Sequence, residues 1–166
     1  MEPRRIWWAR PRKLCALERP GGGGRSHRPD RREGEIAYLK AAGVRAVISL
    51  MSTKHNLDAY RAAGMEAIHL PVEEDYDGLM EAVACVRRET RKAAAVAIHA
   101  NRYTDFVAAV AALHLCEQRN VYLEDALDSA IEAGLVVTKR VAALVEAEPE
   151  WAYDLPDLPG GAVPVP

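Results

Sequence analysis

Short apolar runs alternate with helix-forming segments from residue 31 to residue 119, and this order restricts the fold more than any other feature of the chain. Val44 to Met51 is a near-continuous apolar run, as expected of a strand that is buried on both faces. Residues 65–70 and 94–98 are predicted to be further strands, with helices between them. Strands that alternate with helices form right-handed crossovers in a parallel sheet. The sequence therefore predicts an α/β fold with a central, mostly parallel sheet of about four or five strands flanked by helices.

Two more short strands are predicted before this region, at residues 6–9 and 13–17. Helices are predicted at residues 31–42, 56–63, 79–92, 104–119, 123–131 and 139–148. The glycines predicted to end three of these helices are Gly43, Gly64 and Gly134. The chain has 166 residues, which is the length of one domain. We expect a single domain over residues 1–148 and a Pro/Gly-rich tail over residues 149–166.

Charge and cysteine content exclude several classes of function. The formal net charge of −2 provides no general attraction to nucleic acid or to an anionic membrane. No apolar run approaches the roughly 18 residues that a membrane span needs. The three cysteines are far apart and show no metal-ligand spacing, so we expect free thiols in a reducing compartment. These observations predict a cytoplasmic protein that binds neither nucleic acid nor membrane and uses no cofactor.

One stretch combines a strand, a tight polar turn and the start of a helix. Residues Val96–Phe106 read VAIHANRYTDF, so the apolar run ends in His99 and the helix opens near Thr104. This is the layout of a strand, a phosphate loop and a helix. Ligands of parallel α/β sheets bind beyond the carboxyl ends of the strands, so we expect the site at the loops after Ile98 and Leu70.

The sequence around this loop carries a further pattern. An aromatic N-terminal strand is followed by Lys13-Leu14, then by the blocks Glu35–Leu50 and Ala63–Val72, and then by the loop that begins at His99. Over residues 5–147 these blocks resemble the small cysteine-dependent phosphatases of the dual-specificity and tyrosine-phosphatase superfamily. The resemblance implies the fold of that superfamily.

In that superfamily the loop reads His-Cys-x-x-Gly-x-x-Arg, followed by serine or threonine. The cysteine is the nucleophile, the arginine binds two phosphoryl oxygens, and the glycine lets the backbone approach the phosphate. His99 matches this pattern, but the cysteine, glycine and arginine positions hold Ala100, Tyr103 and Phe106. The remaining loop positions hold Asn101, Arg102, Thr104 and Asp105. Because alanine has no nucleophilic atom and phenylalanine has no donor, we expect no catalytic residue in this loop.

The loop after Leu70 supplies a candidate general acid. The resemblance implies that this acid falls on Glu74 or Asp75, and the sequence leaves both open. Four carboxylates within residues 73–77 also permit a metal site. No histidine lies at ligand spacing, and a solvated acidic loop is the commoner interpretation, so we predict no metal site.

Arginines outside the acidic loop are candidates for binding an anionic ligand. The segment 19–32 contains four consecutive glycines and has a net charge of +4, from five arginines against one aspartate. It matches no phosphate-binding fingerprint, and a flexible solvated loop is the simplest interpretation. The arginines that we select as ligand-binding candidates are Arg25, Arg28, Arg31 and Arg102.

Three functional hypotheses follow. The first is a catalytically inactive phosphatase-like protein, a pseudophosphatase, which acts by binding a protein partner or a phosphorylated ligand, or by forming a homo-oligomer. The alternative is an active phosphoester hydrolase with a remodelled, cysteine-independent pocket that uses His99, Arg102, Asp105 and residues 73–77. The third is a phosphoinositide or nucleotide binder without turnover.

Overall fold

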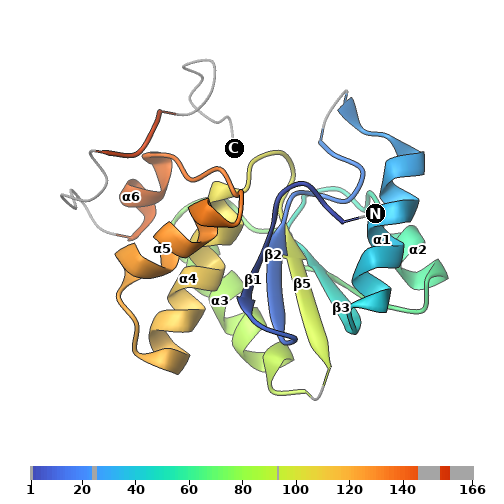
Figure 1. Ribbon diagram of the computed structural model, residues 1–166, viewed down its shortest axis with the longest axis horizontal. Coiled ribbons are helices and arrows are strands. Elements are labelled where there is room, and N and C mark those ends of the chain that lie inside the picture. The colour runs from blue at the N-terminus through green and yellow to red at the C-terminus, as the bar shows by residue number, and fades with distance from the viewer. Residues whose placement is uncertain (1, 24–25, 93, 146–153, 158–166) are drawn as a thin grey trace.

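The computed structural model describes residues 2–23, 26–92, 94–145 and 154–157 (Figure 1). A five-stranded sheet with the order β1-β2-β5-β3-β4 lies at the centre. Its strands are β1 (Ile6–Arg10), β2 (Leu14–Leu17), β3 (Val44–Ser49), β4 (Glu66–His69) and β5 (Ala95–His99). Strands β2, β5, β3 and β4 are mutually parallel, and β1 pairs antiparallel with β2. The predicted α/β fold with a mostly parallel sheet is confirmed.

Six helices surround the sheet within the described residues. They are α1 (Pro29–Ala41), α2 (Leu57–Ala62), α3 (Tyr76–Thr90), α4 (Asp105–Arg119), α5 (Leu123–Glu132) and α6 (Arg140–Val145). Helices α1 and α2 lie on one face of the sheet, and α3 to α6 lie on the other (Figure 1). As predicted, α1, α2 and α5 are followed by glycines with positive φ.

Some helix bounds differ from the sequence prediction. Helix α1 begins two residues earlier than expected, at Pro29, because proline fits the first turn of a helix. Helix α3 begins at Tyr76 because the side chain of Asp75 caps it by accepting a hydrogen bond from the Gly78 amide at 2.8 Å. The predicted helix at 139–148 is observed as α6. Its expected last residues, and most of the predicted tail, lie outside the described residues.

The core consists of two apolar clusters, one on each face of the sheet. Ile48 and Ile98 point to the cluster beneath α3 and α4, whereas Val47 and Ala97 point to the cluster beneath α1 and α2. These neighbours on β3 and β5 share a register, so each layer continues across the strands. Because both faces are covered, ligands can reach the strands only at the sheet's edges and ends.

The three cysteines form no disulfide in the structure. Cys15 and Cys85 are buried, and Cys116 is partly buried in α4. Burial raises the pKa of each thiol above its ordinary value, so none is activated as a nucleophile. Within the described ranges, no helix is both long and apolar enough to cross a lipid bilayer.

Candidate functional site at the end of strand β5

His99 is the last residue of β5, and its ring is fully buried. Its Nδ1 lies 2.9 Å from the carbonyl oxygen of Ala100, and its Nε2 lies 2.7 Å from the hydroxyl of Tyr60. A carbonyl can only accept, so Nδ1 carries the proton and Nε2 accepts from Tyr60. Burial lowers the pKa of His99 to about 4, which keeps the ring neutral near pH 7. Both nitrogens are therefore engaged in holding the loop.

Ala100 and Phe106 hold the positions where the resemblance implies a nucleophile and an arginine. Ala100 is buried, and Phe106 is completely inaccessible within the core beneath α3 and α4. Val107, at the position of the expected hydroxyl residue, is equally buried. The Phe106 ring thus packs with apolar neighbours, and the loop has neither an attacking atom nor a guanidinium at these places.

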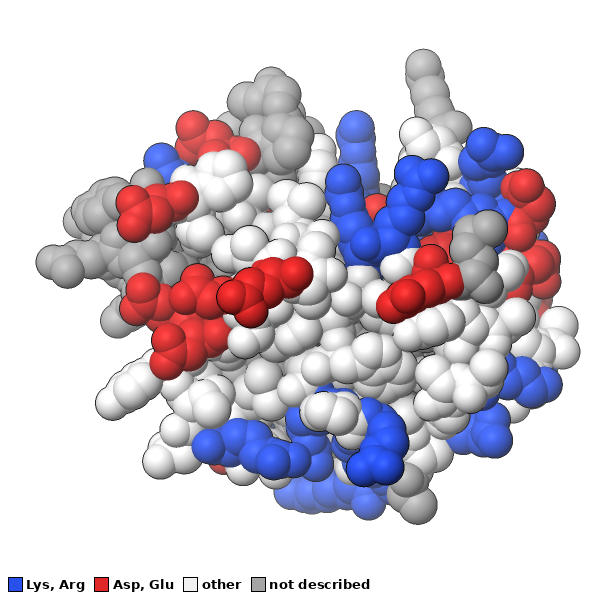
Figure 2. All heavy atoms as spheres, viewed as in Figure 1, with Lys and Arg blue, Asp and Glu red and all other residues white. Residues whose placement is uncertain are grey.

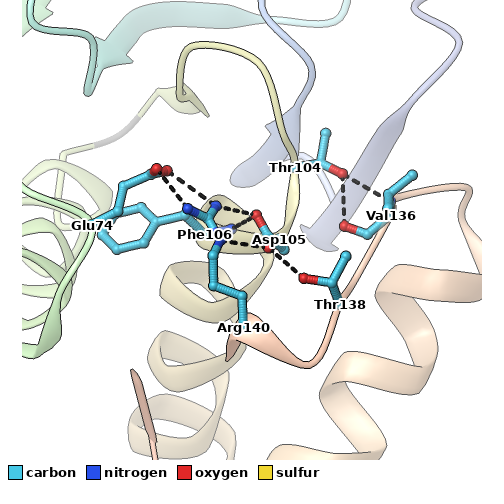
Figure 3. A network of polar contacts seen from close by, with 7 residues as sticks. All are labelled: Glu74, Thr104, Asp105, Phe106, Val136, Thr138 and Arg140. Carbon is cyan, nitrogen blue, oxygen red and sulfur yellow. Dashed lines mark hydrogen bonds and ion pairs between the residues drawn. The ribbon is translucent and has the colours of Figure 1, made fainter. Parts of the chain in front are cut away.

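Asp105 is the first residue of α4, and its buried carboxylate lies at the centre of a polar network (Figure 3). Oδ1 accepts a hydrogen bond from the Phe106 amide at 2.9 Å. Oδ2 accepts from the Thr138 hydroxyl at 2.8 Å and from Nε of Arg140 at 2.9 Å. Helix N-termini favour negative charge, so the position of this carboxylate at the start of α4 is electrostatically favourable.

Arg140 connects this network to the acidic loop. Its guanidinium binds the buried Asp105 and also donates to Glu74 at 2.8 Å (Figure 3). Burial alone would lower the pKa of Arg140, but its hydrogen bonds to the two carboxylates outweigh that effect and raise it. Arg140 therefore links the N-terminus of α4 to the acidic loop.

The two candidate general acids both have structural partners. Glu74 is paired with Arg140, and Asp75 caps helix α3 through the Gly78 amide. Each of these carboxylates is thus engaged in a structural contact. Glu74 is therefore an ion-pair residue, and Asp75 is a helix cap.

Thr104 ties the loop to the segment between α5 and α6. Its hydroxyl donates to the carbonyl of Val136 at 3.0 Å and accepts from the Val136 amide at 2.8 Å (Figure 3). Together with Thr138 and Arg140, this contact fastens the 136–140 segment onto the N-terminus of α4. Sequence reasoning missed these residues because they lie more than thirty positions from Asp105 and form no motif with it.

The middle of the loop is more accessible. Asn101 and Arg102 are exposed, and Tyr103 is partly buried. The guanidinium carbon of Arg102 lies 5.4 Å from the centroid of the Tyr103 ring, and that of Arg140 lies 5.9 Å from it. Two cations near one ring form favourable cation–π contacts. The tyrosine at the glycine position is thus held by these contacts as well as by packing.

The Gly-rich segment lies against this loop. A Cβ atom on Gly23 would be 3.0 Å from the carbonyl oxygen of Asn101 and 3.2 Å from Cα of Arg102, so the two backbones are in close contact. Arg28 is largely exposed, with Asp30 at 3.8 Å. Arg25 lies outside the described residues.

Arg31 does not extend freely toward a ligand. It forms ion pairs of 2.8 Å with both Glu18 and the buried Glu35. Burial of Arg31 opposes a high pKa, but its hydrogen bonds and attraction to these two carboxylates raise the pKa above its ordinary value. Of the arginines selected from the sequence, Arg28 and Arg102 have exposed side chains.

The acidic loop borders a shallow cavity of about 320 Å³. Its carboxylate-bearing lining residues are Glu73, Asp75, Asp77 and Glu81. In the part of the chain that the structure describes, no group of three or more histidine, cysteine, aspartate or glutamate side chains is arranged to hold a metal ion. The cavity is therefore an acidic surface feature.

Comparison with known proteins identifies the fold. No protein-family model matches the sequence, and no curated protein matches it by sequence. Solved structures do match, with sequence identities too low to show more than the fold. Tk-PTP in its active form has a TM-score of 0.63 and 19% identity, and the match covers 85% of this chain and 93% of Tk-PTP.

Two further structures agree with this match. Human DUSP28 has a TM-score of 0.62 and 17% identity over 87% of this chain and 93% of its own. The kinase-associated phosphatase, with its catalytic-site cysteine replaced by serine, has a TM-score of 0.60 and 19% identity over 86% and 89%. The chain therefore has the fold of the dual-specificity and tyrosine-phosphatase-like cysteine phosphatases.

Proposed function

We propose that this protein is a catalytically inactive member of the phosphatase fold, a pseudophosphatase, and that it acts by binding. The observation that carries the proposal is the pair of residues at the start of α4. Asp105 places a buried carboxylate, neutralised by Arg140, at the helix N-terminus, and Phe106 places a buried ring at the next position. The groups that would attract a phosphate are replaced by groups that satisfy one another.

Each missing group removes a specific catalytic contribution. Ala100 cannot form a covalent phosphoryl intermediate, which removes the nucleophilic step outright. Phe106 cannot stabilise the charge that develops on the transferring oxygens. Loss of a nucleophile alone lowers the rate by several orders of magnitude, and here the nucleophile and the arginine are absent together. Glu74 and Asp75, the candidate acids, are engaged with Arg140 and the Gly78 amide.

The alternative, a cysteine-independent hydrolase, would need free groups in the same pocket. His99 uses both ring nitrogens in hydrogen bonds, and its lowered pKa leaves it neutral. Asp105 is enclosed by its partners, and Arg102 is extended over the Tyr103 ring. None of these side chains is poised to activate water, which favours the binding role.

Binding is supported by cationic groups near the loop. Arg28 and Arg102 are exposed; Arg28 has the exposed Asp30 at 3.8 Å, and Arg102 forms no ion pair among the described residues. Such side chains can receive a phosphorylated group or an acidic segment of a protein partner. A second copy of the chain is a further candidate partner, and light scattering across a concentration series would detect it.

The test is hydrolysis of para-nitrophenyl phosphate by the full chain, with and without Mg²⁺ or Mn²⁺. We expect no turnover above that of buffer, and the same result for His99→Ala and Asp75→Asn. Turnover that is present in the wild type and lost in either variant would reject the proposal in favour of the hydrolase. Circular dichroism of each variant would confirm that the comparison is made between folded proteins.

A further inference from the structure

Arg19 follows β2 at the carboxyl edge of the sheet, and its side chain is buried, with a relative exposure of only 6%. Among the described residues it has no carboxylate in ion-pair contact. Its Nε donates to the carbonyl of Gly22 at 3.0 Å, and Nη1 contacts the sulfur of Met51 at 3.7 Å. Burial of a guanidinium without an anion is unfavourable, and burial indeed lowers the pKa of Arg19 from its ordinary value.

The carbonyl oxygen of Gly22 accepts two hydrogen bonds from side chains. Nε of Arg19 and Nδ1 of His27 each lie 3.0 Å from it, so two donors converge on one oxygen. Gly22 has a φ of +85°, a conformation that glycine adopts readily. Without a side chain, a change in its backbone angles would meet little steric resistance.

Two histidine rings beside this oxygen have unused polar atoms. The rings of His27 and His55 meet edge to face with their centroids 4.4 Å apart. Nε2 of His27 and Nδ1 of His55 are buried and have no hydrogen-bond partner within the described residues. Buried polar groups are normally paired, so this local deficit calls for a functional explanation.

The carboxyl ends of the strands carry polar side chains as well. The hydroxyl of Ser49 is fully buried and likewise has no partner within the described residues. Ser49 lies in register with His99 on β5 and with His69 on β4, at the carboxyl ends of three parallel strands. Ligands of open α/β sheets bind at this edge, so the unpaired groups lie where a ligand is expected.

We propose that Arg19, His27 and His55 form a binding site for a small oxyanion of the phosphate class, one oxygen of which replaces the carbonyl oxygen of Gly22. The planar guanidinium can donate to two oxygens of an oxyanion, and each neutral imidazole can donate one N–H, from Nδ1 in His27 and from the unpaired Nδ1 in His55. Glu18 and Glu35 are held by Arg31, which leaves Arg19 available. The inference rests on the proposed binding function and deepens it by naming the ligand group.

The charge distribution supports access for an anion. In Figure 2 one group of Lys and Arg side chains gathers over the N-terminal end of α1, whereas Asp and Glu side chains gather over α5. Burial lowers the pKa of His55, and the charges of Arg19, His27 and Arg32 lower it further. An oxyanion bound beside His55 would be attracted by both Arg19 and Arg32.

The experiment is a titration of the full chain with inorganic phosphate at constant ionic strength, followed by NMR of the histidine ring nitrogens. We expect saturable shifts at His27 and His55. Arg19→Met should weaken phosphate binding by about tenfold or more, because one charge-assisted contact is lost. His27→Gln should weaken it as well, and this second variant keeps the test valid if Arg19→Met fails to fold. Phenyl phosphate is titrated in parallel to distinguish a monoester ligand from free phosphate.

Two matched arginine variants locate the anion. Arg45→Gln removes the same charge from an exposed position on β3, far from the strand's carboxyl end, and should leave the affinity unchanged. Arg88→Gln removes an exposed arginine from α3, on the other face of the sheet, and should also leave the affinity unchanged. Absence of saturable shifts, or loss of binding in Arg45→Gln or Arg88→Gln but not in Arg19→Met, would overturn the inference. Neither result would affect the inactivity proposal, which fails only if phosphate esters are hydrolysed.

Discussion

Asp105 and Arg140 form a two-point ion pair, in which Nε of Arg140 donates to Oδ2 at 2.9 Å and Nη2 donates to Oδ1. The carboxylate belongs to the first residue of α4, and the guanidinium comes from the first residue of α6. The pair therefore fixes the C-terminal helices against the loop that follows β5. The guanidinium also neutralises the Asp105 carboxylate, whose burial as an unpaired charge would be unfavourable.

Removal of this pair's cation should destabilise the fold strongly. Arg140→Met leaves the Asp105 carboxylate buried with only its Thr138 and backbone partners, and we expect a loss of about 3 kcal/mol in the free energy of unfolding. Urea denaturation measures this value. The matched control is Arg87→Met, which breaks the exposed pair with Glu117 and should cost less than about 1 kcal/mol. Equal losses of unfolding free energy in the two variants would show that the buried Asp105–Arg140 pair stabilises the fold no more than the exposed Arg87–Glu117 pair.

The two acidic-loop residues should behave differently when neutralised. Asp75→Ala removes the cap of α3 and should cost about 1 kcal/mol of stability. Glu74→Gln leaves Arg140 bound to Asp105, so we expect a change below about 0.5 kcal/mol in thermal or urea unfolding. A larger loss of stability in Glu74→Gln would mean that the Glu74–Arg140 contact contributes more to stability than we expect.

A thiol introduced at position 100 should not produce catalysis. Ala100→Cys adds a sulfur at a buried position, but the arginine position still holds Phe106 and the Asp105 carboxylate still occupies the helix N-terminus. We expect a folded protein with no turnover of para-nitrophenyl phosphate above that of the wild type. Burst release of nitrophenol, at one equivalent per chain, would show instead that the loop retains a functional phosphate cradle.

Two buried histidines should make the protein acid-sensitive. Burial lowers the pKa of both His99 and His114 from 6.5 to about 4, so the unfolded chain binds more protons than the folded one between these values. Stability should therefore fall as the pH decreases from about 6.5 to about 4, by up to about 3 kcal/mol for each ring. Chemical denaturation across this pH range measures the slope.

The variant His114→Gln separates the two contributions. Nε2 of His114 accepts from Arg10 at 3.1 Å, and a glutamine oxygen can accept in its place. The variant should unfold with a shallower pH dependence, and the remaining slope would belong mainly to His99. An unchanged slope would show that His114 is already protonated, or stays neutral, through the whole range.

The sequence predicted the layers of this fold because apolar runs and helix-period segments alternate in it. The site was less accessible to such reasoning. The contents of residues 99–106 could be read directly, including the methyl group of Ala100. The role of Asp105 could not, because its partners Thr138 and Arg140 are brought to it only by the packing of α6 against α4. For the same reason, the contact of Arg31 with Glu18 and Glu35 was invisible in the charge pattern of the Gly-rich segment.

The complete burial of Phe106 also bears on how such a chain can change over evolutionary time. An arginine in its place would have to force a charged group into an apolar interior, or open a void that a benzyl ring now fills. An arginine could therefore be accommodated at this position only with compensating substitutions around it. The packed aromatic ring thus opposes the acquisition of a phosphate-binding guanidinium at the start of α4.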